Sequence, residues 1–336
     1  MWTCSELKKR ALTNLSPNYW WAFLLVFLYM IIVSTATSLV SGIFGAFSSV
    51  FSTLISTFSI ALGKNPTFSE VIGLLMPLII GFSVLSLLSS ICTYALEVFF
   101  VNPMNCGMIR WFFIQRDLKK INSVDTLFYS FRKDTYKHIV SGMGWKLLWT
   151  SLWGSLSIIP ILFPAAIAIM FGMNTNEFIA GVSRNFGLSD SSARIGTIVM
   201  LSALFVIAIV ICIMINFNRY YSYFYTAYIL IDDHQIGFRE ALRKSRQMSR
   251  GQKGRMFILD LSFIGWWMLV FLTCGFTAVA LYPYLYATYT ELYFFRKEEY
   301  LTDSFARAAD QSTDSFARAA DQSMDSFQSP DTNIPE

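Results

Sequence analysis

Residues 255–297 read RMFILDLSFIGWWMLVFLTCGFTAVALYPYLYATYTELYFFRK, and this stretch decides the fold. Its interior is almost entirely apolar or aromatic, while basic residues stand at both ends. One helix needs about 20 apolar residues to cross a bilayer, so the stretch is long enough for two short helices. A tight turn fits near its middle, at Thr273, Cys274 and Gly275, and Pro283 would bend the second helix. Because Lys and Arg flank both ends, we expect a transmembrane hairpin with both ends in the cytoplasm.

The same stretch admits one other arrangement. A single span would run to about Leu281, and an interfacial segment rich in tyrosine would follow it. The C-terminal tail would then lie outside the cell. The sequence leaves open whether residues 257–295 cross the membrane once or twice.

The composition of the chain is that of a membrane protein. Hydrophobic residues make up 54% of the 336 residues and charged residues only 14%, against about 25% charged residues in soluble domains. The apolar residues fall in long blocks rather than in short amphipathic stretches. We therefore predict an all-α fold, a polytopic transmembrane helical bundle.

Four apolar blocks precede the hairpin, at residues 20–40, 71–101, 147–171 and 196–215. Together with the hairpin, these blocks predict about six spans. Residues 41–68 are rich in Ser, Gly, Phe and Thr, and we expect an external loop there with a short helix on the surface.

The distribution of Lys and Arg predicts the orientation. Basic residues are concentrated in the N-terminal segment, in the connections 102–146 and 232–256, and after residue 295. The expected external loops hold only three basic residues, which are Lys64, Arg184 and Arg194. Since basic segments stay on the cytoplasmic side, we expect both termini and both connections in the cytoplasm.

The chain divides into a transmembrane helical domain, residues 1–300, and an acidic cytoplasmic tail, residues 301–336. The tail contains TDSFARAADQS twice in tandem and begins a third copy as MDSFQS. Such short copies bury little apolar surface, so we expect a disordered tail. The alternative is a partner-binding helix, because a period of 11 residues is close to three helical turns. In that helix Phe305, Phe316 and Phe327 would share one face.

Three acidic residues, Glu97, Asp260 and Glu291, fall within or beside the apolar blocks. Together with Arg219 they form a candidate intramembrane polar site, because ionisable groups in a membrane are costly and often bind ions or protons. The alternative is a structural role, in which the acids pair with Arg219, Arg255 or Arg296. In the hairpin, Asp260 and Glu291 would lie at similar depth, and one of them would then tend to hold a proton.

The second connection carries a cluster of basic residues that suits an acidic surface. Its members are Arg239, Arg243, Lys244, Arg246, Arg250, Lys253 and Arg255. Their simplest role is to set the topology. They also form a candidate patch for anionic lipid headgroups or for a membrane protein partner. We expect no nucleic acid partner, because the charges are adjacent to the membrane and belong to no known module.

Motifs of catalysis are missing from the sequence. It contains no phosphate-binding loop and no HExxH, GxSxG or dinucleotide-binding fingerprint. The five cysteines are scattered without metal-ligand spacing, and the two histidines, His138 and His234, lie far apart in the sequence. We therefore expect no catalytic residue, no metal site, no cofactor and no enzyme activity.

Two function classes remain. The first is a non-enzymatic scaffold or accessory protein that acts through interaction. The alternative is a small-solute or proton-coupled transporter, which the membrane acids favour. A weak similarity between residues 131–133, FRK, and residues 242–244, LRK, also suits the parallel duplication that some transporters show.

Several short pieces resemble one known family. They are SELKKRAL at residues 5–12, NYWWAF at 18–23, LSFIGW at 261–266, and Pro283 followed by Tyr284. The chain resembles an uncharacterised family of bacterial polytopic integral membrane proteins, classified as a domain of unknown function, over roughly residues 1 to 300. The resemblance implies a multi-pass protein of the bacterial cytoplasmic membrane. It implies no activity and no catalytic residue.

Overall fold

The computed structural model describes residues 2–61, 68–118, 123–155 and 190–328, which are helical with short turns and contain no strand. The helices in chain order are α1 (Cys4–Leu15), α2 (Tyr19–Ala61), α3 (Phe68–Leu96), α4 (Asn102–Leu118), α5 (Lys133–Ser155), α8 (Asp190–Ser222), α9 (Thr226–Asp232), α10 (Phe238–Ser249), α11 (Lys253–Leu261), α12 (Ile264–Leu272) and α13 (Ala278–Gln328). Two 3₁₀ turns, η1 (Ser16–Asn18) and η3 (Val124–Phe131), and a π-helical turn, η2 (Glu97–Val101), complete the described elements.

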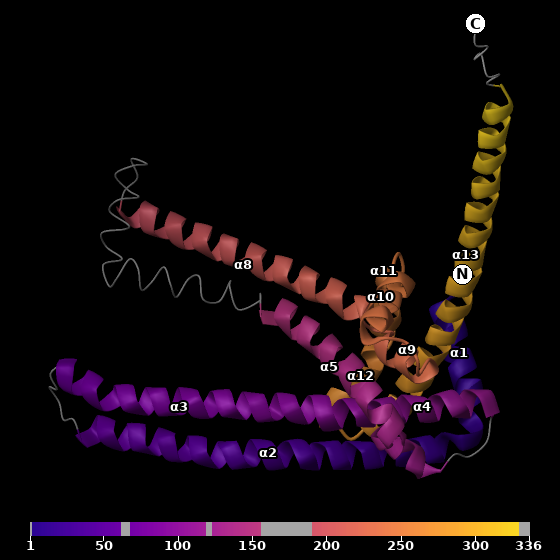
Figure 1. Cartoon of the computed structure of the whole chain (residues 1–336). Helices are drawn as coiled ribbons and strands as arrows, with labels where there is room; N and C mark the ends of the chain where they lie inside the picture. The colour runs from indigo at the N-terminus through magenta and orange to yellow at the C-terminus, as the bar shows by residue number, and fades with distance from the viewer. Residues whose placement is uncertain (1, 62–67, 119–122, 156–189, 329–336) are drawn as a thin grey trace, which may run out of the picture.

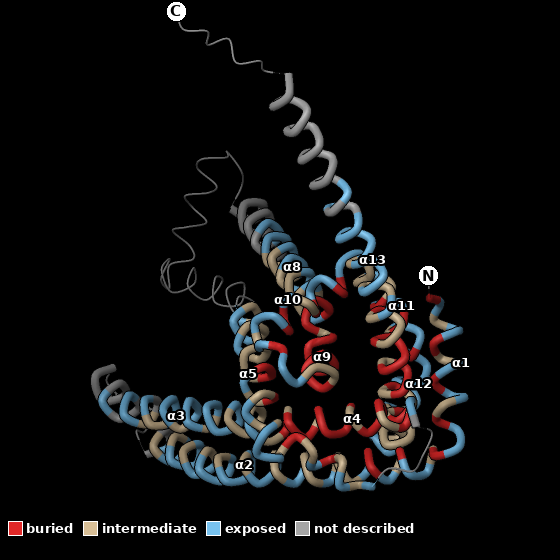
Figure 2. The backbone as a smooth tube through the Cα atoms, turned by 45° about the vertical axis from the view of Figure 1, so that its right-hand side comes forward, coloured by how far each residue is buried: buried red, intermediate tan, exposed pale blue. Residues whose placement is uncertain are grey.

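The buried residues gather where helices from both ends of the chain meet. We call this region the central bundle; it consists of α1, α4, α9, α10, α11 and the Ala278–Arg296 part of α13. Figure 2 shows its buried residues in red. Trp111, Tyr225, Phe263 and Tyr293 are each fully enclosed there, so large aromatic side chains supply much of its apolar contact.

Long helices extend away from the central bundle. Helices α2 and α3 lie side by side along most of their length, and α8 leaves in a different direction beside α5 (Figure 1). In the described residues, three helices are long and apolar enough to cross a membrane, or four if α11 and α12, which meet at a bend of 41°, form one span. Six spans therefore stay a prediction, and much of the expected span 147–171 lies outside the described residues.

Apolar side chains cover the outer surface of these helices. Helix α12 reads IGWWMLVFL and contains no buried residue, and Phe271 and Leu272 are almost fully exposed. Exposure of such a continuous apolar surface to water is unfavourable, whereas its exposure to lipid is not. The exposed apolar helices therefore indicate association with a membrane.

The expected external loop at residues 41–68 is wrong for its first part, because α2 continues as one helix to Ala61. Its Ser and Thr side chains explain the continuity, since their hydroxyls donate to carbonyls one turn earlier in the helix. Ser41 bonds Thr37 at 2.5 Å, and Thr57 bonds Thr53 at 2.8 Å. These polar side chains are thus satisfied within an apolar helix. At 1.5 Å per residue, α2 is about 65 Å long and exceeds one bilayer core.

The turn of the hairpin lies where the sequence predicts it. Cys274 and Gly275 both have positive φ, 52° and 95°, and they reverse the chain between α12 and α13. The two arms then run antiparallel, because Phe263 packs on Tyr284 and Trp267 packs on Tyr282. The α13 arm is not among the helices apolar enough to count as a span, so a double crossing stays a prediction.

Helix α13 continues far beyond the central bundle. It extends to Gln328 through the repeats, whereas we expected a disordered tail. The Ala and Arg content of each repeat favours a helix. Phe305 is 72% exposed, and Figure 1 shows this part of α13 projecting away from the rest of the molecule.

Two glycines differ sharply in their surroundings. A Cβ at Gly107 of α4 would overlap the carbonyl oxygen of Leu127, so glycine lets η3 approach the backbone of α4. Gly265 of α12 has no atom within 4 Å of its Cβ position. Gly265 therefore does not mark a close helix contact in the described residues, whereas Phe263 of the same LSFIGW piece is fully buried.

Candidate functional site

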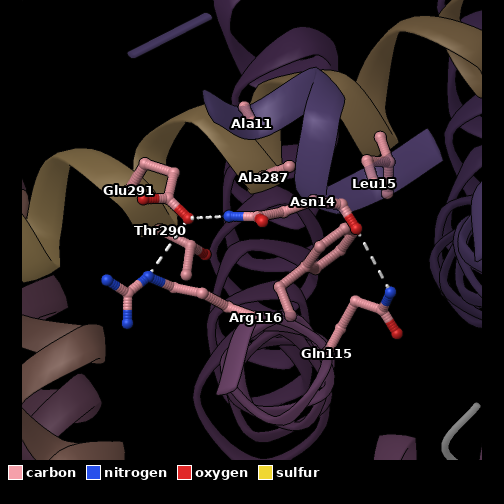
Figure 3. A pocket seen from close by; sticks show the side chains of 9 residues that line it. Ala11, Asn14, Leu15, Gln115, Arg116, Ala287, Thr290 and Glu291 are labelled. Atoms are coloured by element: carbon pink, nitrogen blue, oxygen red, sulfur yellow. Dashed lines mark hydrogen bonds and ion pairs between the residues drawn. The ribbon is translucent and has the colours of Figure 1, made fainter. Parts of the chain in front are cut away.

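Glu291 joins three elements of the central bundle. Its side chain belongs to α13 and is only 6% exposed. One carboxylate oxygen accepts hydrogen bonds from the Asn14 amide of α1 at 2.8 Å and from Arg116 Nε of α4 at 3.1 Å (Figure 3). The arginine neutralises the carboxylate and the asparagine adds a donor, so this buried charge is compensated by the protein itself.

A small cavity lies beside this carboxylate. Its volume is about 10 Å³, which is room for roughly one water molecule. The hydroxyl of Thr290 lines it and is buried without a hydrogen-bond partner. On the other side, Gln115 donates to the backbone carbonyl of Asn14 at 3.4 Å. The cavity is therefore small, and apolar side chains such as Phe112 and Ala287 line it together with a few polar groups.

Asp260 has a different set of partners. Its two carboxylate oxygens accept hydrogen bonds from the Tyr221 hydroxyl of α8 at 2.6 Å and from the Tyr289 hydroxyl of α13 at 2.8 Å. Phenol donors stabilise a carboxylate without bringing a second charge. Asp260 thus links α11 to two other helices.

The two acids face different neighbours. Tyr289 and Glu291 are two residues apart on α13, which turns their side chains about 200° from each other. Asp260 therefore lies against one side of α13, while Glu291 faces α1 and α4 on another side. Each carboxylate thus has its own donors, and the expectation that one of the two acids holds a proton stays a prediction.

The predicted arginine partners of the acids are wrong. Arg219 lies over the ring of Trp153, with its guanidinium carbon 3.9 Å from the ring centre. Arg255 donates to the carbonyl of Trp2, and Arg296 donates two bonds to the carbonyl of Met248 near the end of α10. The partner of Glu291 is instead Arg116. Within the described residues, Glu97 at the start of η2 forms no ion pair.

The predicted basic patch divides into two groups. Four of its members contact other residues of the protein; they are Arg239, Arg246, Lys253 and Arg255. The other three, Arg243, Lys244 and Arg250, have no hydrogen bond or ion pair with any described residue. Arg243 and Arg250 are exposed, as is Arg246, and Lys244 is half-buried, so the buried face of α10, which includes Leu242 and Met248, does not separate the two groups.

The sequence did not indicate the role of the tyrosine hydroxyls or the surroundings of His234. Tyr129 shares a hydrogen bond of 2.9 Å with Nε2 of His234, and the Arg110 guanidinium lies over the Tyr129 ring. Burial, the Arg110 charge and the His138 charge lower the pKa of His234. A signal for the tyrosine donors was present in the run YYSYFYTAY at residues 220–228, which is richer in phenols than a lipid-facing surface needs.

Metal ligands do not assemble in the described part of the chain. No group of three His, Cys, Asp or Glu side chains there is placed to hold a metal ion. The five cysteines are all free.

Comparison with known proteins identifies a family but no activity. No curated protein and no solved structure matches the chain. A family model described as a protein of unknown function, DUF975, matches residues 1–298, which cover the central bundle and all its long helices but not the repeats. The chain therefore belongs to the DUF975 family of proteins of unknown function.

Proposed function

We propose that the protein is a multi-pass protein of the bacterial cytoplasmic membrane that acts by binding other proteins, as a scaffold or accessory subunit. In this proposal six spans leave and re-enter a central bundle on the cytoplasmic side. Three helical pairs support the arrangement, because α2–α3, α5–α8 and α12–α13 each leave the bundle and return to it.

One observation favours a binding function over transport. The protein's own donors engage both of the acids that lie in the hairpin, Asp260 through two tyrosines and Glu291 through Asn14 and Arg116. A coupling site must instead leave its carboxylate free to bind a proton or a cation during transport. These acids therefore have the environment of structural residues.

A second observation supports interaction as the role. The end of α13 projects from the central bundle, and Phe305 is exposed on it. An isolated helix is only marginally stable in water, so a projecting helix gains stability when another protein covers it.

The transporter alternative depends on the cavity beside Glu291. Its unpartnered Thr290 hydroxyl and the neighbouring Glu291 carboxylate are features of an ion or proton path. Its volume is too small for a solute without a change in conformation.

Flux measurements separate the two functions. Purified protein is reconstituted into liposomes with an imposed pH gradient, and proton entry is followed with a pH-sensitive dye for wild type and Glu291→Gln. We expect wild type to match protein-free liposomes. Proton entry in wild type that Glu291→Gln abolishes would overturn the scaffold proposal.

Photocrosslinking tests the binding role directly. A crosslinking amino acid at exposed Phe305 is expected to give discrete adducts in intact cells. The same amino acid at Leu292, which is 1% exposed, is the matched control and should give none. Absence of adducts at both Phe305 and exposed Arg243 would contradict the proposal.

A further inference from the structure

Three cationic side chains from three helices meet at the end of α8. Lys253 begins α11, and its Nζ donates to the side-chain oxygens of Asn218 and Ser222, each at 2.6 Å. Arg246 of α10 donates to the Tyr223 hydroxyl at 3.0 Å. Asn218 and Ser222 lie in the last turn of α8 and Tyr223 directly follows it, so both cations lie against the same end of α8, which also carries Arg219. Figure 1 shows α8 ending against α10 and α11.

The packing of α10 on α8 holds this group together. Ser245 is fully buried and donates to the backbone carbonyl of Ser222 at 3.0 Å, which fixes Arg246 beside the end of α8. The positive charges of Arg219 and Arg246 both act on Lys253. The three side chains thus form one cluster, although 34 residues separate the first from the last in the sequence.

The cluster lacks a counter-ion. None of the three cations forms an ion pair with an acid of the described residues, and their contacts are an amide, hydroxyls and an aromatic ring. Nε of Arg219 is also buried without a hydrogen-bond partner. The nearest acid of α11, Asp260, bonds to Tyr221 and Tyr289 instead. Three gathered like charges are unfavourable unless an anion joins them.

The surroundings favour a phosphate as that anion. The guanidinium and ammonium groups supply charge-assisted donors, and the first backbone N–H groups of α11 add a partial positive charge. No side chain caps the start of α11, and the space around Gly254 is open. An oxyanion can therefore approach both Lys253 and the start of the helix.

The position in the molecule favours a lipid as the source of the phosphate. The cluster lies where the apolar part of α8 ends and where the α11–α12 pair begins. Trp153 packs against Arg219, and Phe217, Tyr220 and Phe257 lie on the adjoining turns of α8 and α11. Aromatic residues of this kind collect at the headgroup level of a bilayer.

We infer that Arg219, Arg246 and Lys253 form a binding site for the phosphate of an anionic phospholipid headgroup. The inference does not rest on the protein-binding function, and it differs from the basic patch suggested by the sequence. It adds Arg219 from α8 and leaves out Arg239, Arg243, Lys244, Arg250 and Arg255.

Lipid binding by the intact protein tests the site. Wild type and Arg246→Gln/Lys253→Gln are purified in a neutral detergent, and binding of short-chain phosphatidylglycerol is measured by native mass spectrometry. The control is Lys244→Gln/Arg250→Gln, which removes the same charge from the same region. Phosphatidylcholine and inorganic phosphate are the comparison ligands.

We expect the affinity of the site variant for phosphatidylglycerol to fall roughly 25-fold, since each basic residue near an anionic surface contributes about fivefold. The control should fall by less than about threefold, because Lys244 and Arg250 share no hydrogen-bond partner with the cluster and salt screens charges at a distance. Phosphatidylcholine should bind wild type and the site variant equally weakly. Equal losses in the site variant and the control would overturn the inference.

Two further measurements distinguish loss of the binding site from loss of folding. Lys253→Arg retains the charge and should retain binding, so its loss of affinity would contradict a phosphate site. Melting temperatures without lipid identify any variant that fails to fold, and Arg219→Gln then replaces it. Inorganic phosphate that protects the protein as well as phosphatidylglycerol does would overturn the lipid source and leave a site for free phosphate.

Discussion

At the residue scale, Gly107 has the least room for a side chain among the glycines of the described residues. A methyl group there would overlap the backbone of Leu127, which cannot move without displacing η3 from α4. We expect Gly107→Ala to lower the free energy of unfolding by about 1 to 3 kcal/mol, measured by thermal denaturation in detergent. The control is Gly265→Ala, which places the same methyl group in open space and should leave stability unchanged or slightly higher.

The pair of Arg116 and Glu291 gives a second prediction at this scale. Arg116→Gln leaves a nearly buried carboxylate with Asn14 as its remaining donor. We expect a loss of about 1 to 2 kcal/mol, a reduced figure because Arg116 is partly exposed. The double variant Arg116→Gln/Glu291→Gln should recover part of that loss. A loss in the double variant equal to the sum of the losses in Arg116→Gln and Glu291→Gln would show that the pair is not coupled.

His234 makes stability depend on pH. Because burial and the nearby Arg110 and His138 charges lower its pKa, the folded state favours the neutral imidazole. The resulting stabilisation is complete above the unfolded pKa of about 6.5 and is lost as the pH falls through the lower folded value. We expect the melting temperature of wild type to drop between pH 7.5 and 5 by more than that of His234→Gln. Parallel pH curves for the two proteins would contradict this.

Only some of these residues could be identified from the sequence. Asp260 and Glu291 could be identified, because an acidic residue within an apolar block is unusual whatever the packing of the helices. Their partners could not, since Asn14 and Arg116 reach Glu291 from 277 and 175 positions away. Long-range packing, which composition and spacing do not encode, decides which arginine meets which acid.

At the element scale, the reversal between α12 and α13 determines on which side the tail lies. Six spans with a cytoplasmic tail require both arms to cross the membrane. A protease site inserted after exposed Leu301 should therefore resist protease added to intact spheroplasts and be cut after lysis. Cleavage before lysis would show a single crossing. An identical site in exposed residues of η3, such as Asp125, is the cytoplasmic control.

The elements differ in how well the sequence predicts them. The turn at Cys274 and Gly275 was predictable, because a break between two apolar arms needs residues that tolerate positive φ. The continuation of α2 to Ala61 was not, because Ser and Gly also mark loops. In an apolar helix, Ser and Thr hydroxyls can bond carbonyls of the same helix, so these residues do not indicate a loop there.

At the scale of the whole molecule, orientation follows from which loops carry the basic residues. Single cysteines at Asn65 and Asn185 should react with an impermeant maleimide in intact cells, and a cysteine at Ser123 should not. The second cytoplasmic cysteine is placed at Gln247, which is exposed. Nearby Ser249 is buried, so a cysteine there would not react with maleimide from either side of the membrane. Labelling of Ser123→Cys or Gln247→Cys from outside would invert the topology.

The contact between α1 and α13 also has a consequence for synthesis of the chain. Asn14 emerges from the ribosome long before Glu291, its hydrogen-bond partner. The apolar face of α1, which includes Ala11 and Leu15, is therefore only partly covered until Ala287 of α13 joins the same cluster. A chain released before residue 287 leaves part of that face exposed, and exposed apolar surface of this kind promotes aggregation. Closure of the central bundle thus depends on synthesis of α13.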